Sequence, residues 1–221
     1  IVMVRGSITL EVMVIHNDFI LHKIRIFNTN TYLDDAILMT NEVDLNSIAK
    51  NQDLEFYLRL KTSIKNGEEF FSDQNGFQWM PRRRSKSLEV EGNYFPITTS
   101  AFMQDDKTRI TLVTTHAQGA TSMREGELEV MIDRKIRWDD GRGMGEGIVD
   151  NIRMQHNFYL TIETISVDNN KNYYQLPSLL AQHLTNVINY PANVFTTNRH
   201  DAIKELKLFN YEFPCDHHLV N

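Results

Sequence analysis

Cysteine is nearly absent from this sequence: the 221 residues contain only Cys215, so no disulfide can form within the chain. With a single thiol, cysteine usage does not reveal the redox compartment. No stretch approaches the roughly 20 apolar residues of a membrane-spanning helix, so we predict no membrane contact by this segment. Basic residues are outnumbered too, and the formal net charge of −6 argues against nucleic acid as a partner.

The composition is that of an ordinary globular protein, with 41% hydrophobic and 24% charged residues. A chain of this length can bury roughly 70% of its unfolded surface, so it can form a substantial core. The sequence opens at Ile1 inside an apolar run and stops at Asn221 without a polar tail. We therefore expect it to be a piece of a longer polypeptide.

Most of the chain alternates apolar and polar residues, which is typical of half-buried strands. The predicted strands are Ser7–Ile15, Ile20–Phe27, Ile37–Leu45, Leu54–Ile64, Phe70–Met80, Ala101–Gln104, Arg109–Thr115, Gly126–Ile132 and Asn157–Ser166. The apolar face changes phase around Asn41, which predicts a bulge or weaker pairing there. Strands at this density with little helix predict an all-β fold, an antiparallel β-sandwich.

One segment, Pro177–Asn189, has helical periodicity, with Pro177 in its first turn and Pro191 beyond its end. A polar, Asn-rich stretch precedes it and has the composition of a linker. We divide the chain into a large β-sandwich domain (1–166), a linker with a short helix (167–200) and the start of a further β module (201–221).

The most distinctive stretch is 133–147, in which glycine occupies every second position from Gly141 to Gly147. Such a run is favoured where the chain needs positive φ or must run close to another group. It follows the alternating residues 128–132 and so leaves the end of a predicted strand, where sites are often built. Its spacing does not fit a dinucleotide loop, a P-loop or a calcium loop. A solvated surface hairpin and a binding loop both stay open.

Aromatic residues flank the Asp-Gln-Asn-Gly stretch at 73–76, which is a strong hairpin signal. Phe77 and Trp79 are candidates for stacking on a sugar, although buried hairpin aromatics are commoner. The basic run Arg82–Lys86 follows. Because the chain is acidic overall, we interpret that run as a charged strand edge rather than an RNA or phosphate site.

Signatures of metal binding and of nucleophilic catalysis are missing. Cys215, Asp216, His217 and His218 lack the paired spacing of a structural zinc site. Asp139 and Asp140 are adjacent, so on a strand they would point to opposite faces rather than converge on one bond. We predict no metal site and no catalytic residue in this chain.

Several segments, taken together and in order from about residue 60, resemble the C-terminal β-rich portion of glycoside hydrolase family 38 α-mannosidases of the Golgi α-mannosidase II type. The matching segments are Phe70–Gln78 with Pro81–Arg83, Gly92–Pro96, Asp105–Leu112, Gly126–Arg134, Asp139–Gly147 with Asp150–Asn151, Pro177–Leu180 and Pro214–Asn221. Residues 1–55 match only loosely.

This resemblance implies a β supersandwich of the galactose-mutarotase-like kind. It implies a retaining hydrolysis of mannosides, through a glycosyl-enzyme intermediate, whose carboxylates and zinc lie on an N-terminal catalytic domain absent from this chain. The partners it implies are that domain and a mannose-containing glycan, and the implied compartment is the Golgi lumen. No cofactor is implied for this chain itself.

Within the glycine loop, the resemblance places Arg142 beside the bound mannose, with Asp139 and Asp140 as supporting acids and Gly141 and Gly143 allowing close approach. Gly141 departs from the commoner Asn or Glu of the family. The main hypothesis is that the chain packs on the catalytic domain and completes the mannose pocket. The alternative is a non-catalytic carbohydrate-binding sandwich that stacks sugars on Phe77, Trp79 and Trp138. A third, weaker hypothesis is a structural scaffold for domain assembly.

Overall fold

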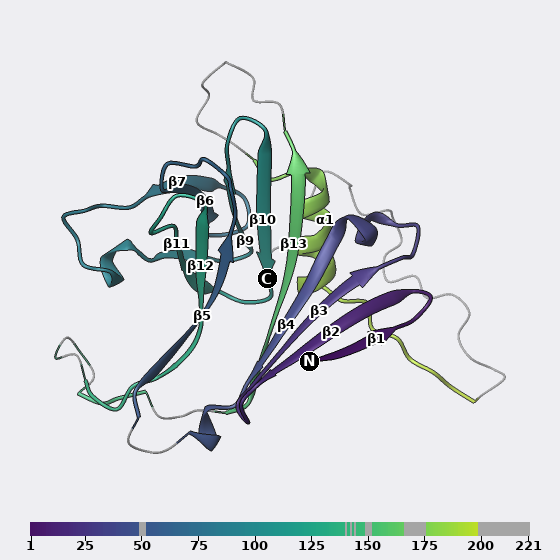
Figure 1. Cartoon of the computed structure of the whole chain (residues 1–221), viewed down its shortest axis with the longest axis horizontal. Coiled ribbons are helices and arrows are strands. Elements are labelled where there is room, and N and C mark those ends of the chain that lie inside the picture. The colour runs from purple at the N-terminus through teal and green to yellow at the C-terminus, as the bar shows by residue number, and fades with distance from the viewer. Residues whose placement is uncertain are drawn as a thin grey trace, which may run out of the picture. The chain divides into compact units, whose positions relative to one another are not determined.

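Thirteen strands and one α-helix make up the computed structural model (Figure 1), which describes residues 1–48, 52–139, 141, 143, 145–148, 152–165 and 176–198. The strands are β1 (Val2–Arg5), β2 (Thr9–His16), β3 (Ile20–Phe27), β4 (Ala36–Val43), β5 (Leu54–Lys61), β6 (Glu69–Asp73), β7 (Trp79–Arg83), β8 (Phe95–Ile97), β9 (Ser100–Gln104), β10 (Thr108–Thr114), β11 (Gln118–Thr121), β12 (Glu127–Lys135) and β13 (Met154–Thr164). Three single-turn 3₁₀ helices lie at Tyr32–Asp35, Leu45–Ser47 and Glu91–Asn93. The all-β fold class is therefore confirmed, and every predicted strand range overlaps at least one observed strand.

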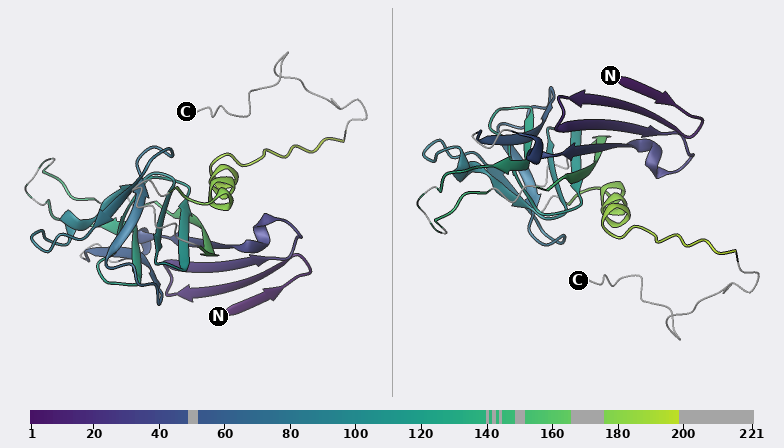
Figure 2. Two further views of the ribbon diagram at one scale, coloured as in Figure 1. Left: turned by 90° about the horizontal axis from the view of Figure 1, so that it is seen from above. Right: turned by 90° about the horizontal axis from the view of Figure 1, so that it is seen from below.

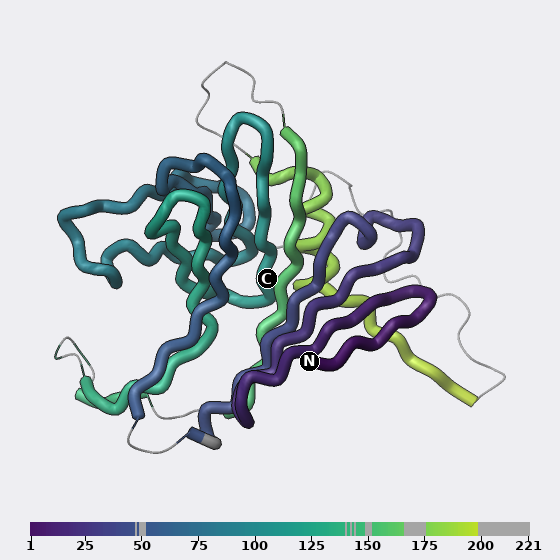
Figure 3. Tube along the Cα trace, in the orientation of Figure 1, coloured from purple at the N-terminus to yellow at the C-terminus, as the bar shows by residue number. Residues whose placement is uncertain are grey.

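The strands form two antiparallel sheets. Nine strands follow the order β1-β2-β3-β4-β13-β10-β9-β6-β7, and four follow the order β5-β12-β11-β8. In the trace of Figure 3, strands far apart in sequence lie side by side, as β4 and β13 do. The range Phe70–Met80 is two strands, β6 and β7, joined by the turn that Asn75-Gly76 signals. The short strands β1, β8 and β11 were not predicted.

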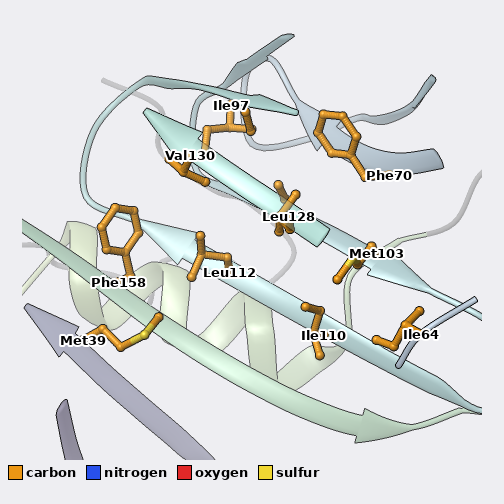
Figure 4. Packing of buried hydrophobic residues seen from close by; sticks show 12 residues of the cluster. Met39, Ile64, Phe70, Ile97, Met103, Ile110, Leu112, Leu128, Val130 and Phe158 are labelled. Carbon is orange, nitrogen blue, oxygen red and sulfur yellow. The ribbon is translucent and has the colours of Figure 1, made fainter. Parts of the chain in front are cut away.

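The core lies between the two sheets. Alternation along each strand sends one set of apolar side chains inward, which is the pattern expected of the inner faces of a sandwich. Figure 4 shows this packing, with Met39, Ile110, Leu112 and Phe158 from the large sheet meeting Leu128 and Val130 from the small one. All six side chains are buried. The hydrophobic pattern therefore fixes which face of each sheet is covered.

The irregularity predicted at Asn41 is wrong. Asn41 pairs in unbroken register with His22 of β3 and His156 of β13, and its side-chain oxygen lies 2.7 Å from His22 Nδ1. The phase change in the sequence reflects a buried polar row rather than a bulge. A register shift occurs instead in β12, between Met131 and Asp133.

A buried carboxylate ties the β6–β7 hairpin to its neighbours. Asp73 has no exposed surface, and it accepts hydrogen bonds from the backbone N–H groups of Gly76, Thr98, Thr99 and Ser100 at 2.8–3.1 Å. The Thr99 hydroxyl donates a further bond at 2.9 Å. Such a set satisfies a buried charge through fixed dipoles instead of an opposite charge.

The helix α1 (Leu179–Asn189) confirms the predicted short helix. It begins at the cap Ser178, whose hydroxyl accepts from Ala181 N–H at 3.1 Å. Ala181 and Leu184 are buried against Val113 and Tyr159, on the side of the large sheet opposite the core between the sheets. Figure 2 shows the helix on that side. Residues 1–191 form one compact unit, and the β module predicted for 201–221 lies outside the described residues.

Candidate functional site

The glycine loop starts and ends at a backbone bridge that holds its two arms together. Beyond β12, Ile136 and Ile148 form an antiparallel bridge with reciprocal backbone hydrogen bonds of 3.1 and 2.5 Å. Next to it, Lys135 is 7% exposed and its Nζ donates to the carbonyls of Leu45 and Ile48 at 3.2 and 3.1 Å. Ion–dipole bonds to carbonyls satisfy this buried ammonium group without a carboxylate. The loop therefore projects from a fixed platform.

Two kinds of glycine occur in the loop. A Cβ on Gly147 would lie 2.4 and 2.5 Å from the carbonyl oxygens of Ile136 and Arg137, so only glycine fits where the two arms meet. A Cβ on Gly141, Gly143 or Gly145 would meet nothing within 4 Å. Gly141 and Gly145 have φ of +75° and +74°, which glycine adopts without strain. Contacts within the described chain therefore explain Gly147 but not the other three.

The arm of the loop is polar and exposed. Trp138 is 70% exposed, with the Arg137 guanidinium 5.3 Å from its ring centroid. Asp139 accepts a hydrogen bond from Gly141 N–H at 3.0 Å, which makes a local turn. Asp140 and Arg142 lie outside the described residues, so the predicted roles of these two residues stay predictions.

The three stacking candidates do not form one surface: Trp79 is buried, and Phe77 and Trp138 lie on different sheets. Trp79 is 6% exposed, packs with Phe71 and Phe102, and donates its indole N–H to Ser100 Oγ at 2.9 Å. Its ring is therefore committed to the core, as buried tryptophans with a satisfied N–H usually are. Phe77 is 52% exposed on the β6–β7 turn of the large sheet, whereas Trp138 follows β12 of the small sheet.

Two arginines of the basic run after Trp79 make contacts within the domain. Arg82 donates from Nε to Ser72 Oγ at 3.1 Å and lies over the Phe95 ring, and Arg84 donates to the Met123 carbonyl at 3.1 Å. Arg84 also lies 4.0 Å from Glu68. These contacts agree with the strand-edge interpretation.

A pocket of about 400 Å³ lies on the outer face of the four-stranded sheet, and sequence reasoning missed it. Its floor holds Glu129, whose carboxylate lies 3.0 Å from Arg59 Nε and 3.5 Å from the Tyr94 hydroxyl. The rings of Tyr57 and Tyr94 are 5.9 Å apart at its rim. Alternation along β5 places Tyr57 and Arg59 outward, but only the fold brings in Tyr94 from a distant loop.

Tyrosine phenols are protonated at neutral pH, and the surroundings of this pocket raise the pKa of both Tyr57 and Tyr94 further. Burial, followed by the hydrogen bond to Glu55, raises the pKa of Tyr57 to about 12. Burial, followed by the charge of Glu129, raises the pKa of Tyr94 well above its usual range. At neutral pH both are hydroxyl donors beside a carboxylate acceptor, which is chemistry suited to a polyhydroxylated ligand.

Within the described ranges, no three His, Cys, Asp or Glu side chains gather closely enough to hold a metal ion. The Cys215–His218 cluster lies outside those ranges. No described helix is long and apolar enough to cross a membrane.

Comparisons with a family model and with individual proteins both point to the glycosyl hydrolases of family 38. Residues 1–142 match the C-terminal domain of the glycosyl hydrolases of family 38. The chain is 38% identical to Alpha-mannosidase 2 of Spodoptera frugiperda over 250 residues, which cover 100% of this chain and 22% of that protein. It is 30% identical to Alpha-mannosidase 2 of Homo sapiens over 211 residues, covering 92% of this chain and 18% of that protein. The chain thus spans about one fifth of the length of these relatives.

More distant similarities were also found. Lysosomal alpha-mannosidase of Cavia porcellus is 36% identical over 102 residues, covering 42% of this chain and 10% of that protein. Among solved structures, a putative aldose 1-epimerase of Escherichia coli K12 has a TM-score of 0.31 at 13% identity, covering 74% of this chain and 68% of that chain. That score is a weak likeness, and the fold assignment rests on the strands described above.

Proposed function

The chain belongs to glycosyl hydrolase family 38 as its C-terminal domain, and on that premise we propose that it is the β-sandwich portion of a retaining, zinc-dependent α-mannosidase that trims mannose from N-glycans. Its role is to pack on the catalytic domain and to complete one wall of the mannose pocket. The relatives named Alpha-mannosidase 2 support the substrate class. The compartment that goes with this function is the Golgi lumen.

The observation that carries the pocket role is the contrast within the glycine loop. Its base is held by the Ile136–Ile148 bridge, and Gly147 is required there by close backbone approach. Beyond the base, Gly141, Gly143 and Gly145 face open space. A rigid platform with an open, glycine-rich tip suits a loop whose contacts lie on another domain.

Arg142 is the residue that we assign to the sugar. A guanidinium presents several fixed donors, so it can hold a hydroxyl pair or a carboxylate in one orientation. Asp139 and Asp140 would orient it or join the domain interface, and Gly143 would keep a side chain out of the way.

The bond-breaking groups are not assigned to this chain. A retaining glycosidase needs two carboxyl groups about 5 Å apart, one as nucleophile and one as acid and base. The zinc that goes with this activity is expected on the catalytic domain, and no three His, Cys, Asp or Glu side chains of the described residues lie close enough together to hold a metal ion. We therefore place neither a metal-dependent step nor a proton transfer on the described residues.

Hydrolysis of p-nitrophenyl α-mannoside, with zinc added, tests this proposal. The complete enzyme that contains the chain is expected to release p-nitrophenol, and the 221-residue chain is expected to release none. Turnover by the chain alone would overturn the division of roles. An inactive complete enzyme would overturn the activity itself.

A carbohydrate-binding module is the second candidate function. Trp138, with its exposed ring beside Arg137, and the pocket of Tyr57 and Tyr94 favour it, whereas the burial of Trp79 removes one of its predicted platforms. Mannose titration of the isolated chain, followed by tryptophan fluorescence, separates the two functions. Saturable quenching supports the binding module, and an unchanged spectrum supports the pocket-wall role.

A further inference from the structure

The pocket on the outer face of the four-stranded sheet is not explained by the role of the glycine loop. Its volume of about 400 Å³ lies within the range of roughly 300–1,000 Å³ that small-molecule sites have. Tyr57 and Tyr94 give it aromatic surface. Val90 and Met123 add apolar surface, and three arginines and two glutamates complete the lining. Apolar walls that surround a few polar groups are typical of a binding site.

Two aromatic rings form one side of the pocket. Tyr57 points outward from β5, because its neighbours in the strand, Phe56 and Leu58, pack toward the core. Its ring centroid lies 5.9 Å from that of Tyr94, and the two rings are inclined at 41°. Aromatic rings present an electron-rich face, onto which the C–H groups on one side of a sugar ring can pack. The two tyrosines therefore offer a platform for the apolar face of a sugar.

A carboxylate and a guanidinium lie side by side in the same pocket. Glu129 Oε1 lies 3.0 Å from Arg59 Nε, and Glu127 Oε2 lies 3.9 Å from the same nitrogen. Because both ion pairs use Nε, the terminal nitrogens of Arg59 can donate to a ligand. Glu129 Oε2 accepts the Tyr94 hydroxyl at 3.5 Å, a long hydrogen bond that leaves it able to accept another. Neighbouring hydroxyls of a sugar both donate and accept, so they match this donor and acceptor.

The loop that carries Val90 and leads to Tyr94 is fixed by one buried side chain. Asn93 is 1% exposed, and its Oδ1 accepts a hydrogen bond from the Ser85 N–H at 2.6 Å. Its Nδ2 donates to three backbone carbonyls of the same loop at 2.9–3.3 Å. These bonds close residues 85–93 into a compact loop ahead of β8. A wall that is held in place before a ligand arrives lowers the ordering cost of binding.

The charges of the lining favour a neutral ligand over an anion. Arg59 is paired with both carboxylates of the pocket. Arg84 donates to the Met123 carbonyl at 3.1 Å and lies 4.0 Å from Glu68. Two of the three arginines therefore already have partners, and an anion would also be repelled by the Glu129 carboxylate. A neutral polyol meets no such repulsion, because its hydroxyls can face either charge.

We propose that this pocket binds one hexopyranose ring of a neutral glycan. The C–H face of the ring packs on Tyr57 and Tyr94, and two neighbouring hydroxyls are held by Arg59 and Glu129. The choice of a mannoside as the sugar rests on the proposed function, because an enzyme that trims N-glycans meets chains rich in mannose. The recognition chemistry itself rests on the contacts of the pocket and not on the role of Arg142.

Saturation-transfer NMR with methyl α-mannoside tests the proposal on the 221-residue chain. Neither Trp79 nor Trp138 lines the pocket, so tryptophan fluorescence does not report on this site. The chain is expected to transfer saturation to the ligand, with a signal that levels off as the mannoside concentration rises. The protons on the C–H face of the ring should receive the most. A chain that transfers no saturation to the mannoside would overturn the proposal.

Two substitutions of Tyr57 provide a matched pair. Tyr57→Ala removes part of the aromatic platform and should weaken binding about tenfold or more. Tyr57→Phe keeps the ring and removes only the hydroxyl, which donates to Glu55 outside the lining, so it should bind as the unmodified chain does. Glu129→Gln removes the charged acceptor and should also weaken binding. If Glu129→Gln fails to fold by circular dichroism, the Tyr57 pair still decides, and equal binding by its two members would overturn the proposal.

Inorganic phosphate separates a neutral ligand from an anion. Phosphate is expected to leave the saturation transfer to methyl α-mannoside unchanged, and displacement of the mannoside by phosphate would overturn the proposal. The test is also separate from that of the proposed function. A chain that binds no mannoside, beside a complete enzyme that hydrolyses p-nitrophenyl α-mannoside, defeats this proposal alone. Binding by the chain, beside an inactive complete enzyme, defeats the proposed function alone.

Discussion

His156 Nδ1 lies 3.0 Å from His116 Nε2 where the two sheets meet. His156 belongs to β13 and is 3% exposed, and His116 lies in the connection between β10 of the large sheet and β11 of the small one. Burial, followed by the neighbouring His116, lowers the pKa of His156 to about 4, and burial lowers the pKa of His116. The pair is therefore neutral in the folded domain at neutral pH.

We predict that the domain loses stability as the pH falls. An unfolded histidine binds a proton below a pH of about 6.5, whereas folded His156 binds one only near pH 4, so the unfolded state holds more protons between these values. The stability that comes from keeping His156 neutral is fully present above pH 6.5 and is lost as the pH falls toward 4. The loss by about pH 4.5 should be on the order of 2 kcal/mol in the free energy of unfolding, measured by urea denaturation at a series of pH values.

Two glutamine variants separate this pair from other titrating groups. His156→Gln should flatten the pH dependence of the unfolding free energy even if it lowers stability at pH 7. His16→Gln, at an exposed position, should leave the slope as it is. A slope that His156→Gln does not change would assign the acid sensitivity to other groups.

Asp73 should be among the most sensitive positions for stability. Asp73→Ala leaves several buried N–H groups without an acceptor, and Asp73→Asn turns an amide donor toward them. We expect Asp73→Ala to cost roughly 3 kcal/mol or more and Asp73→Asn to be destabilising as well. Thermal melting by circular dichroism measures both. The exposed Asp106→Asn is the control and should change stability by less than about 0.5 kcal/mol.

The two kinds of loop glycine should respond differently to alanine. Gly147→Ala places a Cβ against the Ile136 carbonyl and should break the bridge to Ile148, which would speed amide exchange across residues 136–148. Gly143→Ala meets no neighbour and should leave exchange in the isolated chain unchanged. Equal effects of the two substitutions would show that the base of the loop is not held as described.

The sequence predicted the main strands, whereas the short strands form only because distant segments of the chain pair with them. Alternation located β2, β3, β4 and β5, and the Asn75-Gly76 signal located the β6–β7 turn. The strand β8 contains Pro96, and β11 has only four residues including Gly119, so pairing with neighbours rather than local pattern makes them strands.

The site was predictable only in part, for the same reason. The glycine spacing identified the loop, and the structure adds that Gly147 is a packing glycine. The sequence left Trp79 as a stacking candidate but favoured a buried hairpin aromatic, and the structure adds its hydrogen-bond partner, Ser100, whose position no local pattern reveals. The pocket of Tyr57 and Tyr94 likewise depends on a contact between residues 37 positions apart in the sequence.

The most direct measurement is the kcat/KM of the complete enzyme for p-nitrophenyl α-mannoside after Arg142→Ala, with the exposed Arg83→Ala as the control. If the loop completes the mannose pocket, Arg142→Ala lowers kcat/KM about tenfold or more without changing the melting temperature, because a guanidinium bond to the substrate is worth over 1.4 kcal/mol. Arg83→Ala leaves kcat/KM unchanged. Kinetics of Arg142→Ala that match the unmodified enzyme would contradict the pocket role.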